Sequence, residues 1–377
     1  MKFVHLSDLH IGKRVNEYSM IDDQAYILTE IIDIIDEKKP DAVIIAGDVY
    51  DKPVPSAEAI QLFDDFLYKL SNRKIHIFII SGNHDSPERL AFGNRLMNER
   101  IHISPVYNGC VKPIELTDAY GKVNVYMLPF VKPINVRSCF PDEEIDSYDN
   151  AVSFAVKNMN INFDERNILV THQFVTGANR CESEEISVGG SDNIDASIFD
   201  GLDYVALGHI HGPQNIGCEH IRYCGSPLKY SFSEANHKKS VTLVDLKEKG
   251  NIAIETVYLI PRRDMKEIKG KYEDLTQKSF YENTSYNTDY IHITLTDEED
   301  IPDAVIKLRT IYHNLMRLDY DNKRTRNISS INNSESVENK SPFDLFSEFY
   351  REQNGAKMKD EQIDYIKSLI EKIWGND

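Results

Sequence analysis

The sequence is poor in cysteine, and the cysteines that it has are scattered. There are five in 377 residues, and no two of them form a CxxC pair. Structural zinc sites and disulfide frameworks need cysteines grouped at characteristic spacings, so the sequence argues against both. We expect reduced thiols without a catalytic role at Cys110, Cys139, Cys181, Cys218 and Cys224.

Long apolar runs are also missing. No segment approaches the roughly 18 apolar residues that a membrane span requires, and Met1-Lys2 leads into a strand pattern without a signal-peptide pattern. The content of 41% hydrophobic and 10% aromatic residues is ordinary for a globular protein. We therefore expect a cytoplasmic protein with a main domain of about 250 residues and smaller additions.

Positive charge is in deficit. Lys and Arg number 43 against 61 Asp and Glu, which gives a net charge of −18. A field of that sign repels nucleic acid, so local basic patches, bound metal or a basic partner would have to hold a polyanionic substrate. The loops that follow the strands described below do contain basic residues, at Lys13, Arg14, Lys52, Arg89, Arg95, Lys229, Lys238 and Lys239.

Apolar strand patterns that end in Asp, Asn or His recur over the first two thirds of the chain. Residues 2–6 predict a buried strand, and Asp8 and His10 follow it on an extended turn, where both can point to the same side. A helix is predicted over 22–38 and a second strand over 42–46, which ends in Gly47-Asp48. This βαβ unit would bring Asp48 to the same sheet edge as Asp8.

The pattern continues with further strands. A helix over 56–70 and a strand over 75–80 precede Gly82-Asn83-His84-Asp85. Strands over 168–171 and 204–207 would deliver His172, His209 and His211. Other elements are predicted over 123–128, 151–159, 221–224, 240–246 and 252–258, the last two as an antiparallel hairpin. Parallel strands with helices followed by antiparallel strands predict an α/β fold of two packed mixed β-sheets flanked by helices.

Composition changes after Pro261. We expect residues 1–261 to form the main domain and 262–320 a small α+β capping domain. Residues 321–340 are rich in Asn and Ser, with few aliphatic side chains, and predict a flexible linker. Residues 341–377 return to helical periodicity.

Seven of the strand-end residues are suitable metal ligands. One such residue alone is usually a cap or a hydrogen-bonding side chain, but seven after successive strands indicate a metal site. Carboxylate, carboxamide and imidazole donors without thiolates suit Mn²⁺, Fe²⁺ or Zn²⁺. One Asp can bridge two cations about 3.5–4 Å apart, a role that we assign to Asp48. The seven are Asp8, His10, Asp48, Asn83, His172, His209 and His211.

These motifs carry a resemblance. Asp8-x-His10, Gly47-Asp48, Gly82-Asn83-His84-Asp85, His172 and Gly208-His209-x-His211 resemble, in full and in order, the five-part signature of the calcineurin-like metallophosphoesterases. Within that superfamily, the residues around these motifs resemble the SbcD-type nuclease subunits that work with an SbcC-type ATPase. So do Tyr223-Cys224-Gly225-Ser226-Pro227 and residues 344–350, and the resemblance is weakest over 262–340.

The resemblance implies a role for each residue. Asp8, His10 and His211 would hold one metal, and Asn83, His172 and His209 the other, with Asp48 bridging. His84 would face the scissile phosphate and protonate or steady the leaving oxygen. Asp85 would either orient His84 or satisfy loop amides. Some family members have His where Asp51 stands here.

The activity implied is that of a DNA nuclease subunit with two Mn²⁺ ions, or with Mg²⁺ or another divalent ion. It would act as an exonuclease on duplex ends and as an endonuclease on single strands and hairpins, in DNA repair, recombination and replication. Two alternatives stay open: a metallophosphoesterase acting on small phosphodiesters or phosphoproteins, and a chiefly architectural DNA-end-binding subunit. The partners implied are DNA, a second copy of the chain in a heterotetramer and the coiled-coil ATPase.

Two apolar stripes predict amphipathic helices within 341–377. Ser341-Pro342 is a typical helix start. One stripe contains Phe343, Phe346, Phe349 and Tyr350, and the other Ile363, Ile366, Leu369, Ile370, Ile373 and Trp374. They could pack on the chain's own core or bind a partner, and the resemblance favours the base of the SbcC-type coiled coil.

Overall fold

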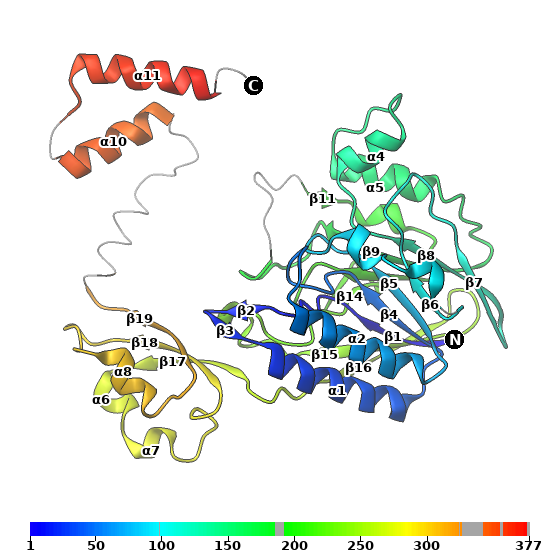
Figure 1. Ribbon diagram of the computed structural model, residues 1–377, viewed down its shortest axis with the longest axis horizontal. Coiled ribbons are helices and arrows are strands. Elements are labelled where there is room, and N and C mark those ends of the chain that lie inside the picture. The colour runs from blue at the N-terminus through cyan, green and yellow to red at the C-terminus, as the bar shows by residue number, and fades with distance from the viewer. Residues whose placement is uncertain (98, 185–191, 324, 326–341, 355–356, 375–377) are drawn as a thin grey trace. The chain divides into compact units, whose positions relative to one another are not determined.

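The computed structural model describes residues 1–377 except 98, 185–191, 324, 326–341, 355–356 and 375–377 (Figure 1). The chain divides into two compact units. The larger comprises Met1–Ile268, Leu275–Ile293 and Asp303–Leu318, and the second comprises Lys269–Asp274, Thr294–Pro302 and Asp319–Asp377.

Two six-stranded mixed sheets form the body of the larger unit. The first has the order β16-β15-β1-β4-β5-β6, with bounds Ile252–Tyr258, Ser240–Leu246, Lys2–Leu6, Ala42–Ala46, His76–Ile80 and Ile101–Ile103. The second has the order β13-β14-β12-β9-β8-β7, with bounds Gln214–Ile216, Cys218–Tyr223, Tyr204–Gly208, Arg166–His172, Gly121–Leu128 and Ile114–Asp118. In the first sheet β1, β4, β5 and β6 are parallel, and the antiparallel strands β15 and β16 lie on one side of them. In the second sheet β14, β12, β9 and β8 are parallel, with antiparallel β13 and β7 at the two edges. The predicted fold class is therefore confirmed.

Alternate side chains of each strand pack into different clusters. On β4, Val43 and Ile45 pack with helices α1 (Ile21–Lys38) and α2 (Ala57–Ser71), whereas Ile44 and Ala46 face the second sheet. The second sheet has its own helical cover, which includes α5 (Tyr148–Lys157). The layers therefore run helix, sheet, sheet, helix (Figure 1).

Shorter elements connect these layers. Two small pairs of strands are present: β2 (Arg14–Val15) with β3 (Tyr18–Ser19), and β10 (Phe174–Val175) with β11 (Asn193–Ile194). The short helices are α3 (Pro87–Leu90), α4 (Pro133–Cys139) and 3₁₀ turns at Asn94–Leu96, Ala196–Phe199 and Phe232–Glu234. The five cysteines are free thiols, as expected.

A three-stranded sheet follows the main sheets, in the order β17-β18-β19. Its bounds are Met265–Gly270, Tyr290–Leu295 and Leu315–Tyr320, with helices α6 (Tyr272–Leu275), α7 (Lys278–Tyr281) and α8 (Ala304–Arg309). Apolar patterns in the sequence predict a strand over 290–295, a helix over 304–312 and a strand over 314–318, but they miss β17. In β17 apolar Met265 and Ile268 alternate with charged residues too irregularly to indicate a strand.

Two helices lie in the second unit: α10 (Pro342–Asn354) and α11 (Asp360–Trp374). The prediction of two helices in 341–377 is confirmed. The predicted linker lies largely outside the described residues, as do Ser341 and the side chains of Ile370, Ile373 and Trp374. No helix in the described part of the chain has the length and apolarity that a membrane span needs.

Candidate metal centre

Strand ends from both sheets meet at one place. Asp8 follows β1 and Asp48 follows the neighbouring parallel strand β4, in the first sheet. His172 ends β9 and His209 follows the neighbouring parallel strand β12, in the second sheet. Because the carboxyl ends of parallel strands share one edge, the packing of the two sheets brings these side chains together.

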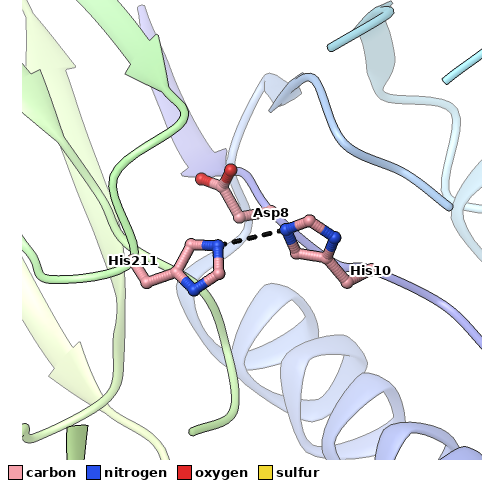
Figure 2. Close-up of side chains that lie close together, drawn as sticks. All are labelled: Asp8, His10 and His211. Atoms are coloured by element: carbon pink, nitrogen blue, oxygen red, sulfur yellow. Dashed lines mark hydrogen bonds between the residues drawn. The ribbon is translucent and has the colours of Figure 1, made fainter. Parts of the chain in front are cut away.

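One set of donors consists of Asp8, His10 and His211 (Figure 2). A ligand atom of each lies within 4.8 Å of the others, and all three side chains are at most 2% exposed. The Nε2 atoms of His10 and His211 are 3.1 Å apart. Two imidazole nitrogens at this separation can share only one proton, whereas a cation between them would satisfy both lone pairs.

A second set consists of Asn83, His172 and His209. The Asn83 Oδ1 atom lies 3.0 Å from His172 Nε2 and 3.0 Å from His209 Nδ1. His172 Nδ1 lies 2.8 Å from the Ala46 carbonyl oxygen, to which it donates, so a neutral His172 presents an Nε2 lone pair to Asn83. An amide oxygen with two imidazole nitrogens 3.0 Å away is a donor set that suits a divalent cation.

Asp48 lies between the two sets. Its Oδ2 atom is 3.3 Å from His172 Nε2 and 3.6 Å from His10 Nε2. Its Oδ1 atom accepts a hydrogen bond of 2.9 Å from the His84 backbone N–H. The carboxylate therefore faces one histidine of each set.

The charge of the site fits divalent cations. Asp8 and Asp48 are 0% and 2% exposed, and no Lys or Arg of the described chain forms an ion pair with either. Burial raises the pKa of Asp8. Burial would also raise the pKa of Asp48, but His172 and His10 outweigh it and hold that pKa well below its ordinary value. Buried carboxylates that stay ionised need cations close by.

His172 responds to the same carboxylates. Burial lowers its pKa, but Asp48 outweighs burial and raises the pKa to about 9. A proton on His172 thus balances the negative charge when no other cation does. The residues present therefore fit two divalent ions, which would displace such protons on binding.

His84 lies beside the first set of donors. Its ring packs edge-on against that of His10, with centroids 4.7 Å apart, and its Nδ1 atom donates to the Asp51 carbonyl oxygen at 3.0 Å. His10, Asp48 and His84 also form a group that could hold a metal ion. The geometry thus allows His84 either as a ligand or as a residue that contacts substrate.

The carboxylate of Asp85 binds the amides of two neighbouring loops. It accepts from the backbone N–H groups of Gly82, Val49 and Tyr50, at 2.9, 3.1 and 2.9 Å. Burial raises the pKa of Asp85 to about 6. Of the two roles open for Asp85, these contacts match the one that satisfies loop amides, and the Asp51 carbonyl takes the orienting role.

The ligand loops are not extended, which corrects the expectation for Asp8 and His10. Their φ angles are 53° and 43°, and those of Asp48 and His209 are 50° and 104°. Such left-handed conformations cost about 1–3 kcal/mol each in residues other than glycine. Backbone hydrogen bonds from Asp8 N to Gly47 O, 3.1 Å, and from His10 N to Asp48 O, 2.9 Å, hold the first two loops together.

Two glycines make room for the ligands. A Cβ atom on Gly208 would lie 1.8 Å from the Ala46 carbonyl oxygen, and one on Gly82 would lie 2.1 Å from Asp48 Oδ1. No side chain fits at either position without moving a candidate ligand or the group that orients it. The glycines of both motifs are therefore needed for the close approach of neighbouring backbone.

Gln24 forms hydrogen bonds that hold the first ligand loop in place, and the sequence patterns did not identify it as a site residue. It is 1% exposed, donates to the His10 carbonyl oxygen at 2.7 Å and accepts from the Gly12 N–H at 2.9 Å. The signal that could have found it is a glutamine on the apolar stripe of the predicted helix 22–38.

Glu234 and Lys239 form a buried ion pair behind His211, also missed. Glu234 Oε1 lies 3.4 Å from His211 Nδ1, and the Ser183 hydroxyl lies 2.8 Å from the same nitrogen. Lys239 Nζ contacts Glu234 and donates to the His211 carbonyl oxygen at 2.8 Å. Lys239 is only 5% exposed, so the expectation of a basic residue in a loop that faces DNA is wrong for this lysine.

Comparison with known families gives two matches. Residues 1–213 match the family model described as calcineurin-like phosphoesterase, and residues 261–354 match the one described as type 5 capsule protein repressor C-terminal domain. A relative from Staphylococcus epidermidis, named as the D subunit of the SbcCD nuclease, is 34% identical over 382 residues, which is 99% of this chain and 99% of that protein.

Solved structures are more distant. A dimetal phosphatase from Danio rerio is 11% identical over 69% of this chain and 98% of its own, with a TM-score of 0.40. The protein TT1561 of Thermus thermophilus is 13% identical over 68% and 98%, also with a TM-score of 0.40. On the family model and the full-length relative, this chain belongs to the calcineurin-like phosphoesterases and, among them, to the SbcD family of nuclease subunits.

Proposed function

We propose that the chain is a two-metal phosphodiesterase that cuts DNA as the nuclease subunit of an SbcC/SbcD-type complex. The observation that carries the proposal is the pair of donor sets, with Asp48 between them. Asp8, His10 and His211 would hold one ion, Asn83, His172 and His209 the other, and Asp48 both. Bound Mn²⁺, or Mg²⁺ in its place, would neutralise phosphoryl charge and lower the pKa of the attacking water.

The protein's own groups would do the rest. Asn83 and the imidazoles converge from two sheets, which fixes where a phosphate can bind. His84 donates from Nδ1 to the Asp51 carbonyl, which fixes its tautomer, and we assign to its Nε2 atom proton exchange with the leaving oxygen. Gln24 and Glu234 keep the loops of His10 and His211 in position.

We propose the following domain roles. Residues 1–261 form the nuclease domain, 262–320 a capping domain that helps to embrace DNA, and 321–340 a flexible linker. We propose exonuclease action on duplex ends and endonuclease action on single strands and hairpins, in cytoplasmic DNA repair, recombination and replication.

The proposed ATPase partner would bind residues 341–377. On α10, Phe346 and Phe349 are 38% and 58% exposed, and Tyr365 on α11 is 64% exposed. The two helices contact each other through Gln362, which donates to the Tyr350 hydroxyl at 3.2 Å. Exposed aromatic side chains on paired helices support a docking surface for a coiled-coil base.

A homodimer contact is supported by other exposed apolar side chains. Phe92 and Leu96, shortly after His84 in the chain, are 85% and 91% exposed. Two large apolar side chains this exposed and only four residues apart could contribute to an apolar patch of the kind that marks a protein–protein contact. We propose that they meet a second copy of the chain.

The experiment is cleavage of end-labelled linear duplex, hairpin and single-stranded DNA, with Mn²⁺, Mg²⁺ or chelator, with and without the ATPase. We expect metal-dependent shortening of linear DNA and opening of hairpins, with Mn²⁺ the better ion. Hydrolysis restricted to small phosphodiesters or phosphopeptides would contradict the DNA substrate. Binding of DNA ends without cleavage would favour the architectural alternative.

A further inference from the structure

A groove of about 410 Å³ begins next to the metal centre. Gly212, the residue after His211, lines it, together with Arg180, Arg222, Lys238 and Tyr258. Arg180 connects the groove to the centre: its guanidinium lies 3.4 Å from the centroid of the Phe174 ring, which lies 6.4 Å from that of His209. A strand held at the metal centre could therefore continue into this groove.

The groove is basic in a protein with a net charge of −18. No Asp or Glu in the described part of the chain lines it. Arg222 binds neutral groups, the Asn215 Oδ1 atom at 2.6 Å and the hydroxyls of Thr242 and Thr256 at 3.1 and 3.3 Å. Lys238 is exposed and forms no ion pair with any described carboxylate. The positive charge of Arg222 and Lys238 is thus left for an anion.

Tyr258 adds an aromatic surface. It ends β16, the edge strand of the first sheet, and is 61% exposed. Lys238 Nζ lies 5.9 Å from the centroid of its ring. A positive groove with an exposed ring is the arrangement by which proteins hold a single nucleic-acid strand, with phosphates on the cations and a base on the ring.

Two neighbouring cavities differ from the groove in the charges or in the side chains that line them. In the adjoining cavity of about 200 Å³, each cation other than Lys238 has a carboxylate partner. These pairs are Lys229–Asp264 at 2.7 Å, Lys239–Glu234 at 2.5 Å and Arg263–Asp23 at 2.8 Å. A cavity of about 340 Å³ on another side of the ligand loops sets Arg14 and Lys52 beside Asp51 and Glu58. Among the residues that the structure describes, the first shares Lys238 and Tyr258 with the groove but adds no other cation without a carboxylate partner, and the second has no aromatic side chain in its lining.

We propose that the groove binds a single nucleic-acid strand that leaves the metal centre. Lys238 and Arg222 contact its phosphates, and Tyr258 stacks on one of its bases. A duplex would not fit this role because its bases are already stacked and paired. The inference rests on the proposed function, since it takes nucleic acid as the substrate.

The first test is binding of a labelled single-stranded oligonucleotide to the full chain in EDTA, which prevents cleavage, over a series of salt concentrations. We expect Lys238→Gln to reduce the slope of log K against log salt by about 0.7, the value for one phosphate contact. Tyr258→Ala should weaken binding about 10-fold and leave the slope unchanged. Lys157→Gln, at an exposed lysine on α5, is the matched control and should change neither.

The second test separates the groove from the catalytic centre. With Mn²⁺, the Lys238 and Tyr258 variants should hydrolyse bis(4-nitrophenyl) phosphate at the wild-type rate, because this small diester does not reach the groove. Their KM for single-stranded oligonucleotides should rise.

Three outcomes would overturn the inference. If the wild type cleaves DNA and both variants bind and cut single strands normally, the groove is not the strand site and the proposed function stands. If the variants lose duplex binding to the same extent, the occupant is a duplex. If the wild type hydrolyses only the small diester, the inference and the DNA substrate fail together.

Discussion

Asp48 is the side chain on which both donor sets converge, so its loss should affect two ions at once. We expect Asp48→Asn to keep the fold, because the amide is isosteric and can still accept from His84 N–H, but to lose ligand charge shared by both sites. Hydrolysis in Mn²⁺ should fall below a few per cent of wild type, and bound Mn²⁺, measured by titration calorimetry, below two per chain. Full activity with one ion missing would remove the two-metal proposal.

His84 and Asp85 are adjacent in the chain, yet their replacement should have opposite effects. His84→Ala should retain metal and DNA binding while the chemical step slows about 10²–10⁴-fold, since a general acid contributes that much. Asp85→Ala should instead lower the free energy of unfolding by at least about 2 kcal/mol, because three buried N–H groups lose their acceptor.

Single-turnover rates, Mn²⁺ stoichiometry and urea unfolding distinguish the two. If His84→Ala loses an ion, His84 is a ligand with His10 and Asp48. If Asp85→Ala unfolds like wild type but is as slow as His84→Ala, Asp85 acts in catalysis after all.

At the scale of elements, Gln24 connects α1 to the loop that follows β1. Gln24→Leu should leave the Gly12 N–H without a partner and the His10 carbonyl oxygen with only the Lys13 N–H, and so loosen the loop that carries His10. We expect Mn²⁺ affinity to fall about 10-fold, as for other residues that orient ligands. Gln61→Leu, on the exposed side of α2, is the control and should bind Mn²⁺ normally. Equal Mn²⁺ affinity in both variants would show that Gln24 only packs the helix against the loop and does not orient His10.

Much of this architecture could be predicted from the sequence, for identifiable reasons. Apolar strands are local patterns, and β15, β16 and β18 begin and end where the patterns do. The motif order was enough to name the residues that the two sheets bring together. Strands with few apolar residues, such as β7 and β17, could not be found, because their pairing depends on distant neighbours.

Three features of the site also escaped the sequence. Hydrogen bonds to Gly47 and Asp48 hold the left-handed backbone of Asp8 and His10. These partners are distant in the chain, so a local sequence pattern does not predict this backbone conformation. In the sequence, Lys239 is indistinguishable from a surface lysine, and only the folded structure shows that it pairs with the buried Glu234. The contacts of Asp85 required the positions of three amides.

At the scale of the whole molecule, an ionic cluster joins the two sheets at the end away from the metal centre. Arg166 at the start of β9 pairs with Asp118, with Nη1 to Oδ2 3.1 Å, and donates to the Lys247 carbonyl at 2.7 Å. The amino group of Met1 lies 2.7 Å from Asp118 Oδ2. The hydrogen bonds from Arg166 hold the pKa of Asp118 below its ordinary value.

This cluster predicts a pH-dependent stability difference. Because the folded-state pKa of Asp118 is lowered, its contribution is full above the ordinary pKa of about 3.9 and is lost as pH falls through the folded value. Asp118→Asn should cost about 1–3 kcal/mol of unfolding free energy at pH 7, and the difference from wild type should shrink below about pH 4. Urea unfolding at both pH values measures it. The control is Asp36→Asn, which breaks an exposed ion pair with Arg73 and should change the free energy of unfolding little. If the difference in unfolding free energy between Asp118→Asn and wild type is the same at both pH values, the assignment is contradicted.

Removal of residues 341–377 tests the division of labour along the chain. These helices belong to the second compact unit, whereas every candidate ligand belongs to the first. The truncated protein should therefore keep Mn²⁺-dependent nuclease activity but lose co-purification with the ATPase and any ATP-stimulated cleavage. Full-affinity binding of the ATPase, or unfolding on truncation, would show that the helices serve the chain's own core.

The central place of β1 in its sheet affects how the chain folds during its synthesis on the ribosome. Residues 2–5 pair with β4 on one side and with residues 242–245 on the other. Synthesis proceeds at about 5–20 residues per second, so one edge of this apolar strand stays unpaired for roughly 12–48 s until residues 242–245 have been made. During that interval the nascent chain exposes an unpaired strand edge next to an incomplete site. Newly made chains should therefore depend on chaperones until residue 245 has left the ribosome.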